Sequence, residues 1–172
     1  MEYQNMEFES KTFKNEDFTE RSFKNSSFID CIFEDCNISN VNLEDTKIQS
    51  CKFVNCKILG LNFSKCAKFL LSFSFENCLI SMCDFSNLDL KKTKFNGCQI
   101  FECHFFGTNL IYSVFEDSNL KGSRFQDTNL SYVSFTTAKN YSIDPNKNFI
   151  RKTKFAIPEV IGLLDAFDIE LE

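Results

Sequence analysis

The sequence is short of the residues that form turns in most globular folds. Its 172 residues include no Trp, only 5 Gly and 2 Pro. A loop-rich β-sandwich would need more Gly and Pro for its turns, and a helical protein would need more Ala and Leu. The composition therefore disfavours both of these common classes.

Long apolar runs and an excess of positive charge are also missing. No apolar run approaches the roughly 18 residues of a membrane span, and the polar first residues do not suggest a secretion signal. The 19 Lys and Arg are outnumbered by 24 Asp and Glu, for a net charge of −5, which disfavours direct binding to nucleic acid. We expect a cytoplasmic protein that does not contact membranes and whose 9 cysteines are thiols.

Catalytic motifs are absent as well. His104 is the only histidine, and no nucleophile or acid accompanies it in a base–orienter arrangement. The sequence has no phosphate loop, no dinucleotide-binding glycine motif and no zinc-protease motif. The Cys-x4-Cys spacings at 31/36, 51/56, 78/83 and 98/103 invite a zinc hypothesis, but these cysteines also fit a structural pattern, described below. We therefore expect no enzyme activity, cofactor or metal.

What the sequence does contain is a period of five residues. Every fifth residue from Tyr3 to Phe63 is large and apolar, and so is every fifth residue from Phe75 to Phe135. Neither the 3.6-residue period of a helix nor the 2-residue period of a strand produces this spacing. The residue two before each large one is mostly small, and eight of the nine cysteines stand in this small column, where a buried thiol acts as a small hydrophobe.

The pattern small, polar, large apolar, any, any resembles the pentapeptide-repeat family over about 135 of the 172 residues. The resemblance implies an all-β fold, a right-handed quadrilateral β-helix in which four repeats make one coil. Residues 20 apart should then stack in columns at the strand spacing of about 4.8 Å. From Phe75 onward, where Phe alternates with Ile or Leu, we expect two opposite sides to carry Phe stacks and the other two to carry Ile and Leu. We also expect stacked cysteine pairs, such as Cys31 over Cys51.

The register breaks once, because Phe63 and Phe75 are twelve residues apart rather than ten. Continuing the first frame would put Lys68 in the core, so we expect Phe69 to be the displaced core residue. The segment 64–74 should then form a bulge or short loop with two extra residues.

The repeat pattern predicts a solenoid over 1–138 and a C-terminal capping or dimerisation segment over 139–172. Pro158 and Glu159 suit the first turn of a short helix. An apolar stripe follows at helical spacing, formed by Val160, Leu163, Leu164 and Phe167, and residues 168–172, with Ile169, alternate like a short strand. Because this tail is too short to be stable alone, we expect these five residues to cap the last coil, form a two-fold homodimer, or do both.

The tail is also similar to one branch of the family. Tyr141-Ser-Ile-Asp-Pro, Lys-Phe-x-x-Pro-Glu at 154–159 and Ile-Gly-Leu-Leu at 161–164 resemble the Qnr-type quinolone-resistance proteins and a microcin-immunity protein. The resemblance implies a tail-to-tail dimer that engages DNA gyrase and topoisomerase IV by imitating a DNA duplex. The long projecting loops of many such proteins are missing here. The alternative is a scaffold or regulator that binds an unrelated protein.

Two sets of outward residues are candidates for a partner surface. The apolar set comprises Phe101, Phe106, Ile111, Tyr112 and Tyr132, unless residues 139–156 fold back over it. The acidic set comprises Glu34, Asp35, Glu44 and Asp45, in a region, 1–63, that has 11 acids and 7 bases. Solvated surface charge is the alternative for the acidic set, because no continuous acidic stripe emerges at 20-residue spacing.

Overall fold

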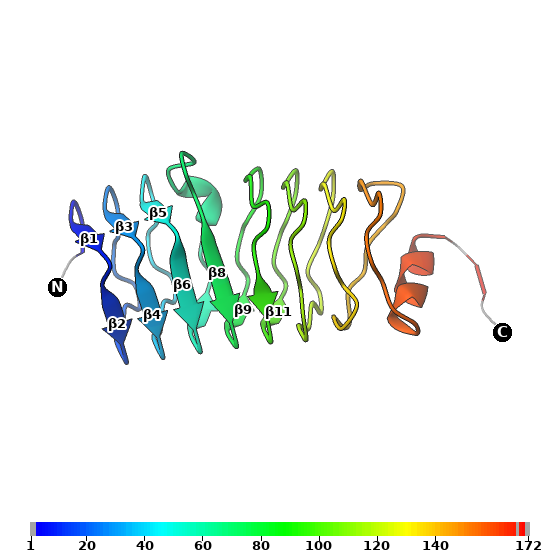
Figure 1. Cartoon of the computed structure of the whole chain (residues 1–172), viewed down its shortest axis with the longest axis horizontal. Helices are drawn as coiled ribbons and strands as arrows, with labels where there is room; N and C mark the ends of the chain where they lie inside the picture. The colour runs from blue at the N-terminus through cyan, green and yellow to red at the C-terminus, as the bar shows by residue number, and fades with distance from the viewer. Residues whose placement is uncertain (1–2, 168, 171–172) are drawn as a thin grey trace.

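The computed structural model describes residues 3–167 and 169–170 and shows a rod of stacked coils (Figure 1). Eleven short strands occupy the first two thirds of the rod: β1 (Glu7–Glu9), β2 (Thr12–Lys14), β3 (Ser27–Ile29), β4 (Ile32–Glu34), β5 (Lys47–Gln49), β6 (Cys51–Val54), β7 (Lys57–Leu59), β8 (Phe73–Glu76), β9 (Leu79–Ser81), β10 (Phe95–Asn96) and β11 (Gln99–Phe101). Two 3₁₀ helices, η1 (Phe63–Lys65) and η2 (Glu159–Ala166), complete the regular elements.

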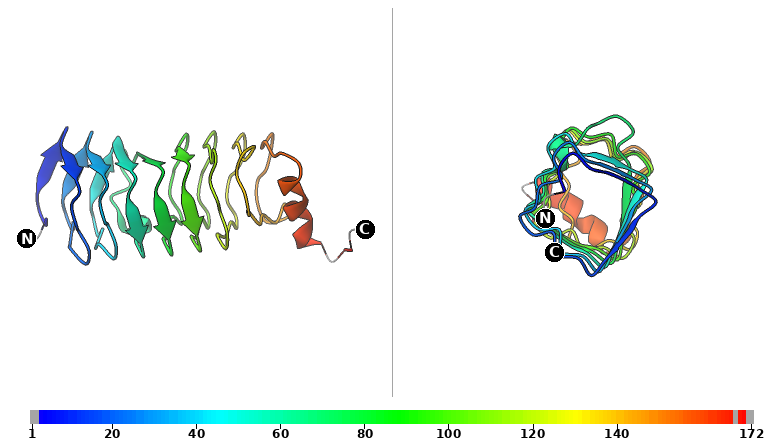
Figure 2. Two further views of the ribbon diagram at one scale, coloured as in Figure 1. Left: turned by 90° about the horizontal axis from the view of Figure 1, so that it is seen from below. Right: turned by 90° about the vertical axis from the view of Figure 1, so that its left-hand side faces the viewer.

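The coil has four faces, which appear as a four-sided outline when the rod is seen end-on (Figure 2). We call the sheet β1-β3-β5 face 1, the sheet β2-β4-β6-β8-β10 face 2 and the sheet β7-β9-β11 face 3. Face 4 is held by single parallel bridges such as Asp84↔His104 and His104↔Arg124. All pairing is parallel, and Phe33 pairs with Phe53, which confirms that residues 20 apart are neighbours. The all-β solenoid predicted from the repeat is confirmed.

The chain turns from one face to the next at residues with a left-handed backbone. These residues stand two positions after the large apolar ones, and most are Asn, Asp, Ser or Gly, which tolerate this conformation best. Corner residues of successive coils also bond to each other, as Asn55 Nδ2 does to Asp35 Oδ1 at 3.2 Å. The residue types at the corners therefore reflect the backbone conformation required there and not packing in the core.

The core consists of stacked rings and aliphatic side chains, as predicted. On face 2, eight phenylalanines stack with ring centroids 4.7–5.6 Å apart and interplanar angles of 2–19°: Phe13, Phe33, Phe53, Phe75, Phe95, Phe115, Phe135 and Phe155. A parallel stack runs along face 4, where Phe105 lies between Phe85 and Phe125 at 5.0 and 4.9 Å. Rings of the two stacks meet edge to face, so each Phe contacts both its own column and the opposite one.

The break in register is present, but Phe69 is not in the core. The pairing offset changes from 20 residues (Phe33↔Phe53) to 22 (Phe53↔Phe75). Ala67 still donates to the Thr46 carbonyl, so the two extra residues lie between Ala67 and Phe73. Phe69 is 78% exposed at the tip of this loop.

The ring that fills the core at the break is Phe73. It is 6% exposed, pairs with Cys51 in register and lies 5.3 Å from Phe63 and 5.2 Å from Phe75. Phe73 thus stands in the small column, where its large ring replaces the apolar residue that the loop removes from face 1. Our prediction for Phe69 was wrong because the frame alone does not show where extra residues leave the coil.

Backbone pairing continues beyond residue 138. Phe149 bridges to Asn129 and Lys154 to Ser134, and the ring of Phe155 stacks on Phe135. Residues 139–155 therefore form one more coil inside the segment that we expected to act as a cap, and they do not fold back over the preceding faces. The strand expected over 168–172 lies partly outside the described residues, and Ile169 and Glu170 have no regular structure.

Candidate functional site

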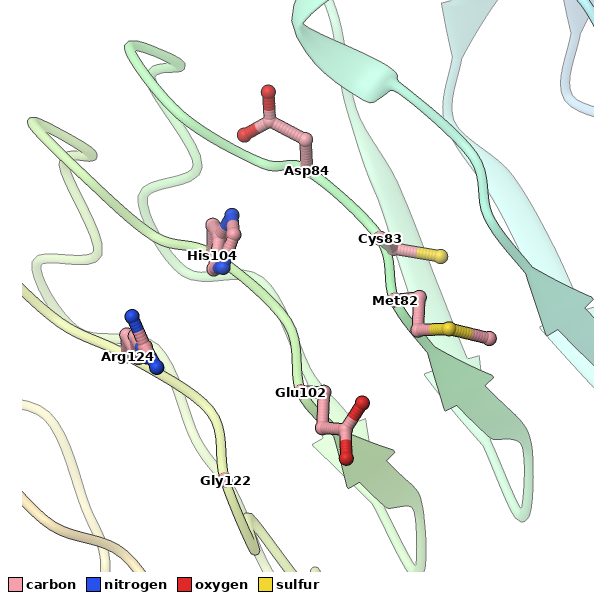
Figure 3. A pocket seen from close by; sticks show the side chains of 7 residues that line it. All are labelled: Met82, Cys83, Asp84, Glu102, His104, Gly122 and Arg124. Atoms are coloured by element: carbon pink, nitrogen blue, oxygen red, sulfur yellow. The ribbon is translucent and has the colours of Figure 1, made fainter.

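A shallow groove follows the corner between face 3 and face 4 around Gly122. Its first part has a volume of about 490 Å³ and is lined by Met82, Cys83, Asp84, Glu102, His104, Gly122 and Arg124 (Figure 3). Two further hollows continue it past Phe101 on one side and past Phe106 on the other. The groove exists because Gly122, at φ +75°, has no side chain at a corner where a Cβ would lie 3.2 Å from Glu102 Cγ.

The polar residues of the groove do not form a catalytic arrangement. Asp84, His104 and Arg124 come from successive coils of face 4 and follow one another along the groove (Figure 3). The carboxylate of Asp84 accepts from the Ser86 backbone N–H at 2.9 Å, so it braces its own turn. The His104 ring stacks on Phe106 at 4.9 Å. Cys83 is buried, and its thiol faces the Ile58 carbonyl at 3.5 Å, away from the histidine.

The nine cysteines are all free and buried. Burial raises the pKa of the Cys51 and Cys66 thiols from 9.0 to about 12. These two thiols are therefore neutral, which makes them poor nucleophiles and poor metal ligands. Within residues 3–167 and 169–170, no group of three His, Cys, Asp or Glu side chains is placed to hold a metal ion.

The predicted apolar surface is divided among several faces. Phe101 ends β11 on face 3, Phe106 lies on face 4, and Ile111 lies on face 1. Tyr112 and Tyr132 share the corner between faces 1 and 2, where their rings stack at 4.8 Å. Tyr112 remains 53% exposed, so the last coil does not cover it.

The predicted acidic residues are also separated, and two of them are paired with lysines. Glu34 lies on face 2 and Glu44 on face 4. Lys14 Nζ lies 2.9 Å from a Glu34 carboxylate oxygen, and Lys24 Nζ lies 2.9 Å from one of Glu44. Asp35 accepts from Asn55, and Asp45 is exposed at a corner. The acids therefore do not join into one negative band.

Three of the predicted dimer residues, Val160, Leu163 and Leu164, lie on η2, which crosses the open end of the last coil (Figure 2). Phe167 and Ile169 follow the helix. Leu163 packs on the core and Val160 is half-buried, whereas Leu164, Phe167 and Ile169 are 36%, 43% and 54% exposed. Gly162 lets the helix approach the coil closely, since a Cβ there would lie 3.1 Å from the Tyr141 carbonyl oxygen. The helix thus covers the last coil and still presents an apolar side to solvent.

Contacts at Asn140 and Tyr141 also join η2 to the last coil. Glu159 accepts from the Asn140 backbone N–H at 3.3 Å. Burial, and then the charge of Glu159, raise the pKa of Tyr141 to about 12. The cap is therefore held by both apolar packing and a specific polar contact.

Neither the groove nor its corner residues Met82 and Gly122 were predicted from the sequence. The signal was present, because most corner positions hold Asn, Asp, Ser or Gly, and Met82 is a large apolar exception that is 60% exposed. Gly122 stands in the same corner column as Met82, two coils later, and leaves a gap there because it has no side chain.

The geometry is that of a repeat protein, and the comparison with protein families agrees. The family model described as pentapeptide repeat region matches residues 6–81 and 79–155. The chain belongs to the pentapeptide-repeat family. No curated protein matches the chain by sequence.

Among solved structures, the chain is similar to two trypsin-treated variants of QnrB1, described as a plasmid-mediated fluoroquinolone resistance protein. One has a TM-score of 0.69 at 16% identity, and the other has a TM-score of 0.50 at 19% identity. Each match covers 99% of this chain and 92% of the QnrB1 chain. The similarity shows that the two proteins share the fold.

Proposed function

We propose that this chain is a non-enzymatic binding protein that dimerises through η2 and acts on DNA gyrase or topoisomerase IV, as the Qnr-type resemblance of its tail suggests. The main support for this proposal is η2, which caps a regular rod and leaves Leu164 and the C-cap residue Phe167 exposed. A second copy placed tail to tail would cover these side chains by two-fold pairing. In the cytoplasm, where this function would be exercised, the buried thiols would stay reduced.

The dimer step can be tested separately from the enzyme target. Light scattering should give the mass of two chains for the unmodified protein and of one chain for Leu164→Glu. Phe69→Glu is the matched control, because Phe69 is a more exposed apolar residue on a loop far from the tail. If the unmodified protein has the mass of one chain at micromolar concentration, the dimer is contradicted.

The target is tested by a supercoiling assay with purified gyrase, with and without a quinolone. We expect the protein either to inhibit supercoiling or to restore it in the presence of the drug. Leu164→Glu should lose this effect, while Phe69→Glu should keep it. An unchanged reaction at a tenfold molar excess of dimer would refute the topoisomerase target.

A second candidate is a scaffold that binds an unrelated protein. The pairs Lys14–Glu34 and Lys24–Glu44 favour it, since they neutralise acids that would have to imitate phosphates. Duplex DNA carries a charge about every 1.7 Å of its axis, far denser than this surface. A normal dimer without any effect on gyrase or topoisomerase IV would support this candidate.

A further inference from the structure

The corner between faces 1 and 2 carries an aromatic column near the C-terminal end of the rod. Tyr112 and Tyr132 stack with their ring centroids 4.8 Å apart and an interplanar angle of 26°. Lysines take the same corner position one coil before and one coil after the pair, at Lys92 and Lys152. Lys152 Nζ lies 5.7 Å from the centre of the Tyr132 ring, within reach of a cation–π contact. We call these four residues the tyrosine corner.

The tyrosines stand where the backbone is unfavourable for them. Their φ angles are +62° and +61°, in the left-handed region. Bulky side chains rarely adopt this conformation, and Asn, Asp or Gly would hold the turn at lower cost. They are the two aromatic residues among the described positions with positive φ. Aromatic rings kept at such positions, with Tyr112 53% exposed and Tyr132 half-buried, point to contact with a partner.

The charge around the tyrosine corner is positive, against the negative charge of the whole chain. Basic side chains flank the rings at both ends of the column and on the adjoining face: Lys92, Lys94, Arg151, Lys152 and Lys154. Within the described part of the chain, none of these five makes an ion pair, whereas the neighbouring Lys91 pairs with Asp89 at 3.0 Å. Unpaired basic side chains around these two tyrosines favour an anionic partner.

We propose that the tyrosine corner is a docking surface for an acidic segment of a partner protein, with carboxylates at the two lysine ends and apolar side chains over the tyrosines. Three coil steps of about 4.8 Å put Lys92 and Lys152 about 14 Å apart, the span of four or five extended residues. Tyr is also among the residue types that contribute most at protein interfaces. The partner need not be a topoisomerase.

Single-stranded nucleic acid is the other anionic occupant, and the geometry disfavours it. Such strands bind by laying bases on free aromatic faces. Here the facing sides of the two rings cover each other, and Lys152 lies over Tyr132, so only the ring edges, the hydroxyls and one face of Tyr112 are left.

The test uses the full-length protein and a labelled peptide of eight residues, with two glutamates at each end and leucines in the middle. Fluorescence anisotropy at low salt should show binding that weakens as salt is added. We expect Lys92→Glu/Lys152→Glu to lose about tenfold or more in affinity, since both end contacts become repulsive. The control, Lys121→Glu/Lys139→Glu, makes the same change in net charge on face 3, and it should bind like the unmodified protein.

A second variant separates binding from folding. Tyr112→Asn/Tyr132→Asn places a residue that suits positive φ at both corners, so its chemical denaturation midpoint should be at least that of the unmodified protein. Its affinity for the acidic peptide should nevertheless fall about tenfold, a loss that impaired folding would not explain.

Three results would overturn the proposal. One is no binding of the acidic peptide at low salt, and another is equal binding by the two charge-reversed variants. The third is an oligothymidylate that binds at least as tightly as the peptide and is weakened by the same substitutions, which would assign the corner to nucleic acid.

Discussion

From residue 31 to residue 103 the small inward column is mostly cysteine, whereas from residue 108 to residue 128 it is serine or threonine. The two kinds of side chain reach the same carbonyl groups at different distances. The Cys51 and Cys56 thiols approach the Phe28 and Phe33 carbonyls at 3.3 Å. The Ser113 and Ser118 hydroxyls donate to the equivalent carbonyls of Leu90 and Phe95 at 2.8 Å.

The hydroxyls also accept hydrogen bonds. Ser118 Oγ receives the Cys98 backbone N–H at 3.0 Å, and Ser113 Oγ receives that of Thr93 at 3.1 Å. All eleven strands end by Phe101, and later coils are paired by single bridges. The comparison indicates that hydroxyl groups add hydrogen bonds between coils whose backbones are already paired, while thiols mainly fill space.

The largest expected effect is alkaline unfolding that begins in the cysteine coils. The folded Cys51 and Cys66 thiols keep their protons up to a pKa of about 12, but unfolded thiols ionise near 9.0. Stability is therefore fully present below pH 9 and is lost as pH rises from about 9 to about 12, by about 1.4 kcal/mol per pH unit for each thiol.

Hydrogen exchange at increasing pH would locate this loss. Protection should fall first in residues 31–83 and later in 108–153. Cys51→Ser/Cys66→Ser should move the unfolding midpoint to higher pH. If both regions open together and the variant behaves like the unmodified protein, thiol ionisation is not the cause.

Removing one ring from the Phe stack should lower the free energy of unfolding by the same amount in both regions. Phe53 and Phe115 belong to one column and are 3% and 0% exposed. We expect Phe53→Ala and Phe115→Ala each to lower the free energy of unfolding by about 3–5 kcal/mol. Urea denaturation measures both. A clear difference between them would mean that the halves differ in core packing as well as in the small column.

Exchanging a thiol and a hydroxyl in the small inward column should change the free energy of unfolding less, and more in one direction than in the other. Ser118→Cys replaces a hydroxyl that both donates and accepts within 3.0 Å, so it should cost about 1–3 kcal/mol. Cys56→Ser should cost less, because the hydroxyl can keep the Phe33 carbonyl as its acceptor. Equal costs in the same denaturation experiment would contradict the proposed division between thiols and hydroxyls.

The smallest effect is expected at the surface of the first region. Lys24 and Glu44 pair at 2.9 Å, but both side chains are exposed. Exposed pairs contribute little in water. Lys24→Gln should leave the thermal midpoint unchanged within error, and a measurable drop would show that these pairs hold neighbouring coils together.

Much of this fold could be predicted from the sequence, because the period of five fixes which side chains face inward. The Phe stacks follow from that period alone. The position of the loop does not, since Phe69 and Phe73 are equally apolar and only the paired backbone distinguishes them. The last coil was not predicted either. Ile150 and Phe155 stand 20 residues after Leu130 and Phe135, but the two repeats before them carry Asn140 and Pro145 in place of large apolar residues, so the period of five is interrupted.

The candidate surfaces were harder to predict. Outward residues face four directions, and assigning Phe101, Phe106 and Tyr112 to one patch ignored that each lies on a different side of the coil. The stacking of Tyr112 on Tyr132 did follow from their spacing of 20 residues. The groove at Gly122 depends on a side chain that is absent, and a pattern of apolar residues does not reveal it.

The loop between Ala67 and Phe73 has a consequence for how such a rod can change. Two residues enter at a corner, and Phe75 is again in phase with Phe53, so every later coil is unaffected. An insertion that would shift the frame of an ordinary β-sheet is here absorbed within one side of the coil. Corners are therefore places where the chain can lengthen while the compensating change, here Phe73 in the core, stays within the same coil.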